Sequence, residues 1–228
     1  MDELNYLAGQ MRNVEHFKKL SPIDLLTIVS SGQVRDFNAG SILFNEGDGC
    51  TGMYVLLKGK INLYKTGPEG QVSIINSLSP VIMFNEVPVL DEQENPTSAL
   101  AIEDVKVWFI PCERFRRLIT RFPELATGLL MVMAKRNRIM IANYSDLSFR
   151  SVPARLAKQL IALSESGTKI INRSIQTNKI IASKIVTTPE AISRTLKQLA
   201  QQKIIESDRL FIKILDIPSL RQLAQMEF

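Results

Sequence analysis

The sequence predicts an α+β fold in which an antiparallel β-roll comes first, a long helix follows, and a small helical domain with a β-hairpin ends the chain. Three observations predict this order. Residues 34–110 hold short apolar runs separated by turn residues, which is typical of an antiparallel barrel or jelly roll. A long helical repeat follows, and two short helix patterns with a hairpin pattern come last. We expect domains at 1–122, 123–149 and 150–228.

The composition favours a folded protein with a polyanionic partner. The chain has 228 residues, a hydrophobic fraction of 45%, a net charge of +5 and an isoelectric point of about 9.2. Residues 150–213 carry twelve Lys and Arg against four Asp and Glu, so the positive charge is concentrated near the C-terminus. No apolar run reaches about 18 residues, and the first residues lack a signal-peptide pattern. We therefore expect a cytoplasmic protein without a membrane partner.

The β-roll prediction depends on a series of short strands. Strand patterns cover residues 41–44, 53–57, 61–64, 72–75 and 105–110. Glycine-containing turn clusters lie between them at 45–49, 58–60 and 67–70. Such regular turn signals without intervening helices favour antiparallel pairing. A short helical pattern at 22–29 is expected to pack on the roll.

The cysteines and the single histidine predict no catalytic or metal site. Cys50 and Cys112 stand 62 residues apart and form no metal-binding spacing, so we expect two reduced thiols. His16 is the only histidine, whereas zinc or a Ser-His-Asp triad needs more convergent ligands. An enzyme using the roll as its pocket could offer only Glu86 as an acid. Without a paired base, nucleophile or metal, we do not expect an enzyme.

The middle of the chain changes to a helical pattern. A short helix at 114–121 is expected to stop at Phe122-Pro123, and a long helix follows until Ser151-Val152-Pro153 marks a hinge. The long helix carries a heptad-like repeat, which predicts a dimer seam. The alternative is an amphipathic helix that packs on its own roll. The predicted seam residues are Leu129, Met133, Arg136, Met140, Asn143 and Leu147.

Two short helices are predicted near residues 178–186 and 189–199. Thr188 is a suitable N-cap, and Pro189 suits the first helical position because its missing N–H would be unpaired there anyway. The turn between the helices falls near Val186. Glycine is often used at such turns because φ is positive, and a β-branched residue would be strained in that conformation. We therefore expect this turn to differ or to be looser.

The second of these helices has an apolar face and a polar face. The apolar face repeats at Ile192, Leu196 and Leu199. The other face combines an acceptor, a hydroxyl and two cations, which are groups that can read base edges and phosphates in a DNA major groove. The alternative is a solvated helix face. The four polar residues are Glu190, Ser193, Arg194 and Lys197.

Apolar runs at 204–205 and 210–214 surround a polar turn at 207–209, which predicts a β-hairpin. Two helices joined by a tight turn and followed by a hairpin form a winged helix-turn-helix, a DNA-binding arrangement. Arg209 at the hairpin tip could then contact a phosphate. Residues 150–228 are accordingly predicted to bind double-stranded DNA.

Several short motifs together resemble one family. They are GSILFNEGD at 40–48, LLKGKI at 56–61, FNEV at 84–87, and Pro189-Glu190 with Ser193-Arg194. In this order of domains they resemble the family of the cyclic-AMP receptor protein and the fumarate-nitrate reduction regulator (CRP/FNR). The resemblance covers nearly the whole chain. It implies a homodimeric transcription factor that places two reading helices about 34 Å apart on a palindrome and acts with RNA polymerase.

The resemblance also implies roles on DNA. Glu190, Ser193 and Arg194 match the reading positions of the fumarate-nitrate branch, which recognises TTGA-like half-sites. Arg194 would contact guanine, and Glu190 would accept from an amino group of cytosine or adenine. The cyclic-AMP branch has an arginine where this chain has Pro189. The backbone contacts would come from Thr188, Lys197 and Arg209.

The sensor part departs from the nucleotide-binding pattern. Glu86 matches the ribose-binding glutamate, but Asn85 replaces the neighbouring glycine, and no arginine lies between residues 81 and 107 to hold a cyclic phosphate. Met140-Ile141 replaces the pair that contacts adenine. The resemblance thus predicts no cyclic-AMP binding. An iron–sulfur cluster is not expected either, because it needs four thiolates and the chain supplies two.

The effector is left open by the residues. An apolar interior could line a pocket or could simply be filled core. The candidate pocket residues are Met83, Glu86, Val87, Met133, Met140 and Ile141. The reading motif and altered pocket resemble the denitrification and nitrosative-stress branch, which offers haem as a cofactor with His16 or a methionine as axial ligand. A lone histidine near a chain start is otherwise expected at the surface. A further alternative is an oligomerisation or effector-sequestering module that has lost specific DNA reading, which Val186 would support.

Overall fold

The structure is a computed structural model that describes residues 2–225, and the side chains of Asp2 and Asn143 are outside this description. The chain divides into two compact units, Met1–Lys135 and Arg136–Phe228. We describe each unit by itself. No helix among residues 2–225 combines the length and the apolar character needed to cross a membrane.

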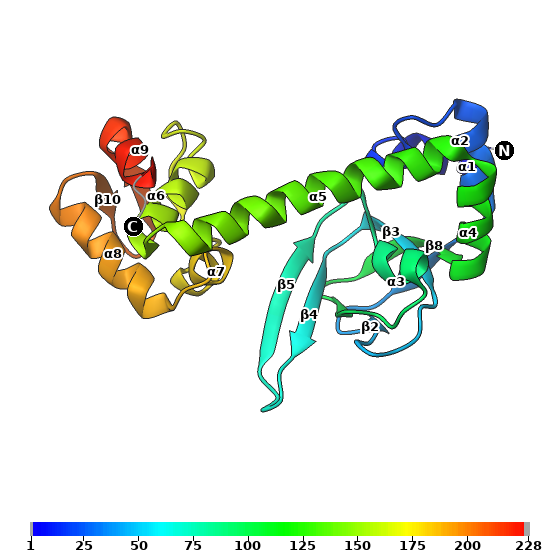
Figure 1. The fold of residues 1–228 in the computed structure, drawn as a ribbon, viewed down its shortest axis with the longest axis horizontal. Coiled ribbons are helices and arrows are strands. Elements are labelled where there is room, and N and C mark those ends of the chain that lie inside the picture. The colour runs from blue at the N-terminus through cyan, green and yellow to red at the C-terminus, as the bar shows by residue number, and fades with distance from the viewer. Residues whose placement is uncertain (1, 226–228) are drawn as a thin grey trace. The chain divides into compact units, whose positions relative to one another are not determined.

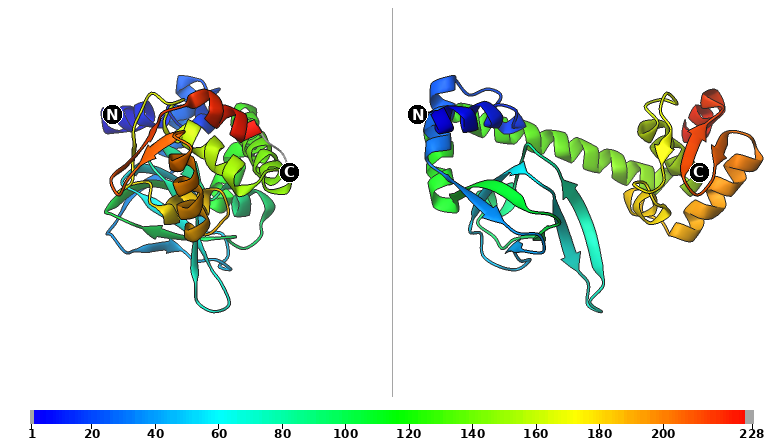
Figure 2. Two further views of the ribbon diagram at one scale, coloured as in Figure 1. Left: turned by 90° about the vertical axis from the view of Figure 1, so that its left-hand side faces the viewer. Right: turned by 180° about the vertical axis from the view of Figure 1, so that it is seen from behind.

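Two antiparallel four-stranded sheets form the β-roll of the first unit, as the sequence predicts. The first sheet has the order β1 (Gln33–Phe37), β8 (Val105–Pro111), β3 (Gly52–Lys58) and β6 (Ile82–Phe84). The second has the order β2 (Ile42–Phe44), β7 (Ser98–Ala101), β4 (Ile61–Thr66) and β5 (Val72–Leu78). The β4–β5 hairpin reaches beyond the other strands (cyan in Figure 2). Its exposed side chains explain why β5 lacks a clear apolar alternation.

The central strands β3 and β8 are buried on both faces. Val55 and Trp108 lie opposite each other and join the apolar cluster under the helices, and Tyr54 and Phe109 join the cluster between the sheets. Because successive side chains of a strand point to opposite faces, double burial produces an uninterrupted apolar run. Trp108 is tied down further, since its indole N–H donates to the carbonyl of Val29 over 3.0 Å.

Helices cover one face of the first sheet. They are α1 (Asp2–Met11), the 3₁₀ turn η1 (Glu15–Phe17), α2 (Pro22–Ser30), α3 (Glu86–Asp91), α4 (Cys112–Arg121) and the start of α5 (Pro123–Phe149). Ser21 caps α2 by accepting from the backbone N–H of Asp24 over 3.1 Å, with Pro22 at the first helical position. The apolar faces of α4 and α5 enter the same cluster through Phe115, Leu118 and Leu125. Figure 1 shows α4 leading directly into α5.

The second unit is a helical domain with a small sheet. Its elements after α5 are α6 (Val152–Leu163), β9 (Ile171–Asn172), α7 (Asn178–Lys184), α8 (Pro189–Gln201), β10 (Ile205–Ser207), β11 (Phe211–Ile214) and α9 (Ile217–Gln225). The strands pair antiparallel in the order β10–β11–β9. Leu156, Leu160, Ile181, Ile192 and Ile212 are fully buried in one cluster, which fixes α6, α7, α8 and the sheet as one body.

Two expectations about single residues are wrong. Cys50 and Cys112 form a disulfide with their Cα atoms 6.6 Å apart, although their sequence spacing predicted reduced thiols. Spacing along the chain says nothing of the β-roll closure that brings these positions together. His16 is only 2% exposed, not at the surface, because η1 is covered by α5: a side chain at Gly128 would collide with the His16 carbonyl.

Candidate functional site

The site begins at the N-terminus of α8. The Thr188 hydroxyl accepts a hydrogen bond from the backbone N–H of Ala191 over 3.2 Å, and Pro189 occupies the first helical position. Glu190 lies in the first turn, where the helix dipole favours a negative charge. The helix start is therefore defined by the local sequence, as the cap pattern predicts.

The inner face of α8 is buried. Ile192, Leu196 and Leu199 are at most 4% exposed, in agreement with their apolar repeat. Thr195 also lies on this face, which the sequence pattern did not indicate. Its hydroxyl donates to the Ala191 carbonyl over 2.8 Å, so the buried polar atom is satisfied within the helix.

The outer face of α8 presents the predicted reading residues to solvent. Glu190, Ser193, Arg194 and Lys197 are all exposed. They follow one side of a helix whose opposite side is anchored in the core. An exposed helical face with an acceptor, a hydroxyl and two cations has the chemistry to contact base edges and phosphates.

Next to α8 stands the hairpin of β10 and β11, with Arg209 exposed at its tip. Asp208 shapes this tip, because its carboxylate accepts from the backbone N–H groups of Leu210 (2.6 Å) and Phe211 (2.8 Å). The N–H of Phe211, and then that of Leu210, lower the pKa of Asp208 below its ordinary value. The ionised carboxylate thus holds the tight turn that displays Arg209.

Arg173 connects the hairpin to α7. Its guanidinium donates to the Asp208 carbonyl over 2.7 Å, to the Asn178 side chain over 2.6 Å and to the Ser207 hydroxyl over 3.3 Å. The sequence analysis missed this residue. The only available signal was its charge, and a charge alone does not reveal which distant carbonyl it meets.

A groove of about 410 Å³ lies between α8 and the hairpin. It is lined by Arg173, Asn178, Ser193, Leu196, Lys197, Ala200, Ser207, Asp208 and Arg209. Three of these residues are cations and one is an acid. The groove therefore joins the predicted reading face and hairpin tip in a single, mainly positive concave surface, which suits a phosphate backbone.

The turn between α7 and α8 is tight, contrary to the expectation from Val186. This residue has φ of 52°, in the left-handed region. The backbone N–H of Thr187 donates to the Ala182 carbonyl over 3.0 Å, which closes a Schellman motif at the end of α7. Val186 is accommodated because its side chain is 63% exposed and points away from the core. The strain is present, but the surrounding hydrogen bonds maintain it.

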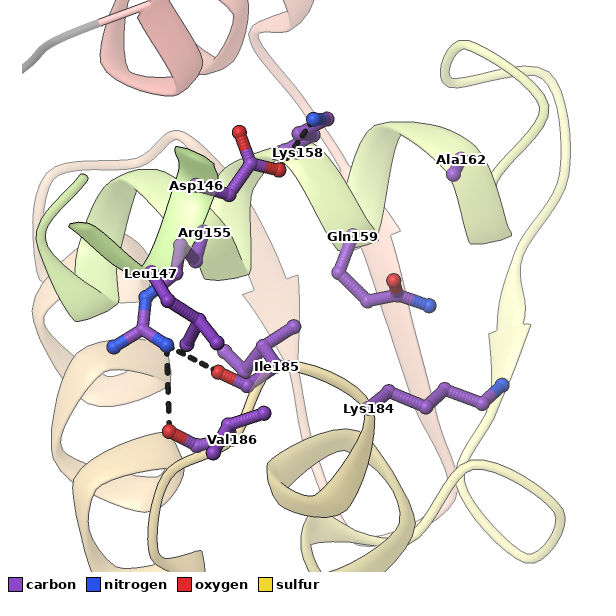
Figure 3. Close-up of a pocket in the computed structure, with 9 residues that line it drawn as sticks. All are labelled: Asp146, Leu147, Arg155, Lys158, Gln159, Ala162, Lys184, Ile185 and Val186. Carbon is purple, nitrogen blue, oxygen red and sulfur yellow. Dashed lines mark hydrogen bonds and ion pairs between the residues drawn. The ribbon is translucent and has the colours of Figure 1, made fainter. Parts of the chain in front are cut away.

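Arg155 on α6 supplies the main support of this turn. Its guanidinium donates to the carbonyls of Ile185 and Val186, the latter over 3.3 Å (Figure 3). These are carbonyls at a helix C-terminus, which lack partners within the helix. A positive charge there is also favoured by the helix dipole. The turn geometry is thus set by a residue about 30 positions earlier in the chain, as the separations of 30 and 31 residues show.

A small pocket of about 190 Å³ adjoins this turn. Figure 3 shows its lining, which comprises Asp146, Leu147, Arg155, Lys158, Gln159, Ala162, Lys184, Ile185 and Val186. Asp146 is paired with Lys158 and, over 3.0 Å, with Arg150. These ion pairs connect the end of α5 to α6 within the second unit.

The candidate effector residues do not form one lining. Met83 is fully buried in the core cluster, and Glu86 is 4% exposed. Val87 and Met133 are 44% and 38% exposed. Met140 and Ile141, 65% and 60% exposed, belong to the second unit. Met83 thus serves as core packing, which was the alternative interpretation of these apolar residues.

His16 does not fit as an axial ligand of haem. Its Nε2 lies 3.2 Å from Oε1 of Glu86, and both side chains are at most 5% exposed. An axial ligand must present a ring nitrogen to a cofactor-sized cavity, whereas this imidazole is enclosed by η1, α3 and α5. Among the described residues, no group of three or more His, Cys, Asp or Glu could hold a metal ion.

The exposed apolar stripe of α5 is shifted by one residue from the predicted seam. Leu129 is 2% exposed and packs in the core of its own chain, so it offers no surface to a partner. Leu130, by contrast, is 68% exposed, and Tyr144 is 72% exposed. The exposed positions at alternating three- and four-residue steps are Leu130, Met133, Asn137, Met140, Tyr144 and Leu147. Arg136 lies beside this stripe, and the side chain of Asn143 is outside the described part.

Comparison with known proteins assigns both parts of the chain. Residues 34–122 match the model of the cyclic nucleotide-binding domain, and residues 154–223 match the Crp-like helix-turn-helix domain. A CRP-like cAMP-activated global transcriptional regulator of Mycobacterium tuberculosis is 28% identical over 231 residues, which cover 99% of this chain and 100% of that protein.

Two proteins of Thermus thermophilus are also similar. The cyclic AMP receptor protein is 28% identical over 214 residues, covering 94% of this chain and 98% of that protein. The solved structure of the catabolite activator protein has a TM-score of 0.56 at 27% identity and covers 92% of this chain and 98% of its own. The chain therefore belongs to the CRP/FNR family and is a CRP-like DNA-binding transcriptional regulator with a sensor domain of the cyclic-nucleotide-binding type; its homologues are regulators, not enzymes.

Proposed function

We propose that two copies of the chain pair through α5 and that their α8 helices read a palindromic operator with TTGA-like half-sites. The observation that carries this proposal is the exposed face of α8, where Glu190, Ser193 and Arg194 stand on a capped helix beside a cationic groove. In related arrangements the second helix of the motif enters the major groove. RNA polymerase is the further partner that the family suggests.

Each reading residue has a chemical role in this proposal. Arg194 donates two hydrogen bonds to the O6 and N7 of guanine, and Glu190 accepts from the amino group of cytosine or adenine. Ser193 contacts either base edge. Pro189 cannot replace the arginine of the cyclic-AMP branch, so the first position of the half-site is not read as guanine there.

Lys197 and Arg209 are proposed to contact phosphates on the two sides of the groove, together with the Thr188 end of α8. Both cationic side chains are exposed, and both line the groove next to the hairpin. Arg173 lies between them, but it already donates to Asp208, Asn178 and Ser207. We assign it to positioning the hairpin rather than to DNA contact.

Dimerisation is proposed to use the exposed stripe of α5. Apolar residues at steps of three and four along one helix face form the contact surface of two-stranded helical pairs. Leu130, Met133, Met140, Tyr144 and Leu147 supply that surface, with Asn137 as a polar member near the middle. A polar residue at such a position favours one register at some cost in stability.

We further propose that the sensor domain does not take a cyclic nucleotide. The Glu86 carboxylate is buried and lies 3.2 Å from His16, and no arginine in residues 82–106 is available for a cyclic phosphate. The motif around Pro189 and Arg194 resembles the denitrification and nitrosative-stress branch, to which we assign the chain. Calorimetry with cyclic AMP and cyclic GMP tests the first statement, and a micromolar dissociation constant for either nucleotide would overturn it.

The experiment for DNA reading compares three duplexes by fluorescence anisotropy at one salt concentration: a TTGA palindrome, a GTGA palindrome and a scrambled sequence. We expect the TTGA duplex to bind tightest, by at least about 10³-fold over the scrambled duplex. A preference for GTGA would place the chain in the cyclic-AMP branch. Equal affinity for all three would instead support an oligomerisation or effector-sequestering module of the same fold.

A further inference from the structure

The disulfide between Cys50 and Cys112 lies at a junction of several elements. Cys50 precedes β3, and Cys112 is the first residue of α4. The backbone N–H of Cys112 donates to the Thr51 carbonyl over 3.4 Å, and Asn85 at the start of α3 donates to the Gly52 carbonyl over 3.0 Å. The bond therefore ties the beginning of α4 to the segment that also holds α3.

The environment of this bond also suits the reduced state. Sγ of Cys112 lies 3.0 Å from the carbonyl oxygen of Cys50, so a thiol formed there has an acceptor already in place. Cys112 is 8% exposed, whereas Cys50 is only partly buried. An incoming thiol thus reaches Cys50 more easily than Cys112, and both redox states have a satisfied local geometry.

A DNA-binding regulator works beside the genome, where glutathione and thioredoxin keep thiols reduced. Disulfides of proteins in such compartments are usually transient and act in catalysis or redox sensing. We propose that Cys50 and Cys112 form a reversible thiol–disulfide switch, and that the oxidised form is the one that binds the operator more tightly. This proposal rests on the proposed function.

The exchange balances with glutathione as the reactant. A glutathione thiolate attacks Sγ of Cys50, the disulfide breaks, and its electron pair passes to Sγ of Cys112, which leaves as a thiolate. That negative charge lies at the first turn of α4, where the helix dipole stabilises it. A second glutathione then releases Cys50 as a thiol and forms glutathione disulfide. Oxidation is the reverse reaction.

The route from this bond to dimerisation runs through packed side chains of the first unit. Phe115 and Leu118 of α4 share one cluster with Leu125 and Leu129 of α5. Leu129 is adjacent to Leu130, the first residue of the exposed stripe. Fixing the start of α4 therefore restrains the helix face that we assign to the partner, and releasing it allows α4 and α5 to shift. A restrained, pre-organised surface binds more tightly.

The test uses the full chain in glutathione buffers that range from fully reduced to fully oxidised. Alkylation followed by mass spectrometry measures the fraction of bonded Cys50–Cys112, and anisotropy measures the dissociation constant for the TTGA palindrome in the same samples. We expect the reduced form to bind about fivefold or more weakly, in the usual range of allosteric coupling. The double variant C50S/C112S should bind alike in all buffers.

Two results would overturn the switch. One is an operator affinity of the wild type that does not follow the bonded fraction, and the other is a bond that glutathione and dithiothreitol leave intact in the folded protein. Far-ultraviolet circular dichroism of each sample shows whether the reduced chain is still folded, and a lost fold on reduction also counts against a switch. If neither redox form nor the double variant prefers the operator over a scrambled duplex, the proposed function itself fails.

Discussion

Arg194 and Lys197 lie three residues apart on the exposed face of α8, yet their removal should have different effects. Arg194→Ala should weaken operator binding by about 1–3 kcal/mol and relax the preference at one base pair, because a bidentate guanine contact is lost. Lys197→Ala should weaken binding to specific and scrambled duplexes by a similar factor. Anisotropy titrations on both duplexes test this, and an equal loss on both duplexes for Arg194→Ala would contradict its reading role.

Val186 has a positive φ that its β-branched side chain disfavours. Val186→Gly should raise the free energy of unfolding by about 0.5–1 kcal/mol, because relief of strain exceeds the added flexibility of the unfolded chain. Ser183→Gly on α7 is the matched control, and it should lower stability by about 0.5 kcal/mol. Urea unfolding of both variants tests the pair. A destabilised Val186→Gly would show that the valine side chain itself supports the turn.

At the scale of elements, the orientation of α7 relative to α8 depends on Arg155 of α6. Arg155→Met should lower the free energy of unfolding of the second unit by about 1–3 kcal/mol, because two carbonyls lose a charged donor. Operator affinity should fall as well. Lys158→Met changes the same charge in the same pocket but removes only an ion pair with Asp146 whose Lys158 side chain is 50% exposed. It should cost at most about 1 kcal/mol. Similar effects of both variants would refute the assigned support.

The stripe of α5 can be tested by charge substitutions on one helix. Tyr144→Glu should dissociate the dimer, because it places a charge in the proposed apolar contact. Ile139→Glu changes an equally apolar and exposed position outside the stripe, and it should leave the dimer intact. Leu129→Ala should cost about 2–5 kcal/mol of stability without a direct effect on association. Sedimentation equilibrium measures the monomer fraction, and the opposite ranking of the two Glu variants would exclude this stripe.

At the scale of the whole molecule, the positive charge is concentrated in the DNA-binding part, with twelve cations against four acids in residues 150–213. Operator affinity should therefore fall steeply with salt, with a logarithmic slope of about −0.9 for each neutralised phosphate. Lys197→Ala should reduce the slope by about 1 for each subunit. Titrations from low to physiological salt test this. A slope unchanged by Lys197→Ala would remove this residue from the phosphate contacts.

Much of the architecture was predictable because it rests on local patterns. The strand runs around β3, β4 and β8, the cap of α8 and the apolar repeat from Ile192 to Leu199 are short-range features, and the structure has them at the expected places. The exposure of Glu190, Ser193 and Arg194 follows from the same helical period. Periodicity decides which face of an element is buried, and this in turn decides which side chains remain available.

Contacts between residues far apart in the chain were not predictable. The Cys50–Cys112 bond, the burial of His16 against Glu86 and the Arg155 donors to the α7–α8 turn each join segments about 30 or more positions apart. The same holds for Leu129, whose place in the core or on the stripe depends on how α5 packs on the β-roll. The sequence by itself determined the elements, their order and the polar face of α8, since these follow from local propensity and periodicity. Only the tertiary structure decided the disulfide, the strained turn and the shifted stripe, because closure of the chain, and no local rule, brings those groups together.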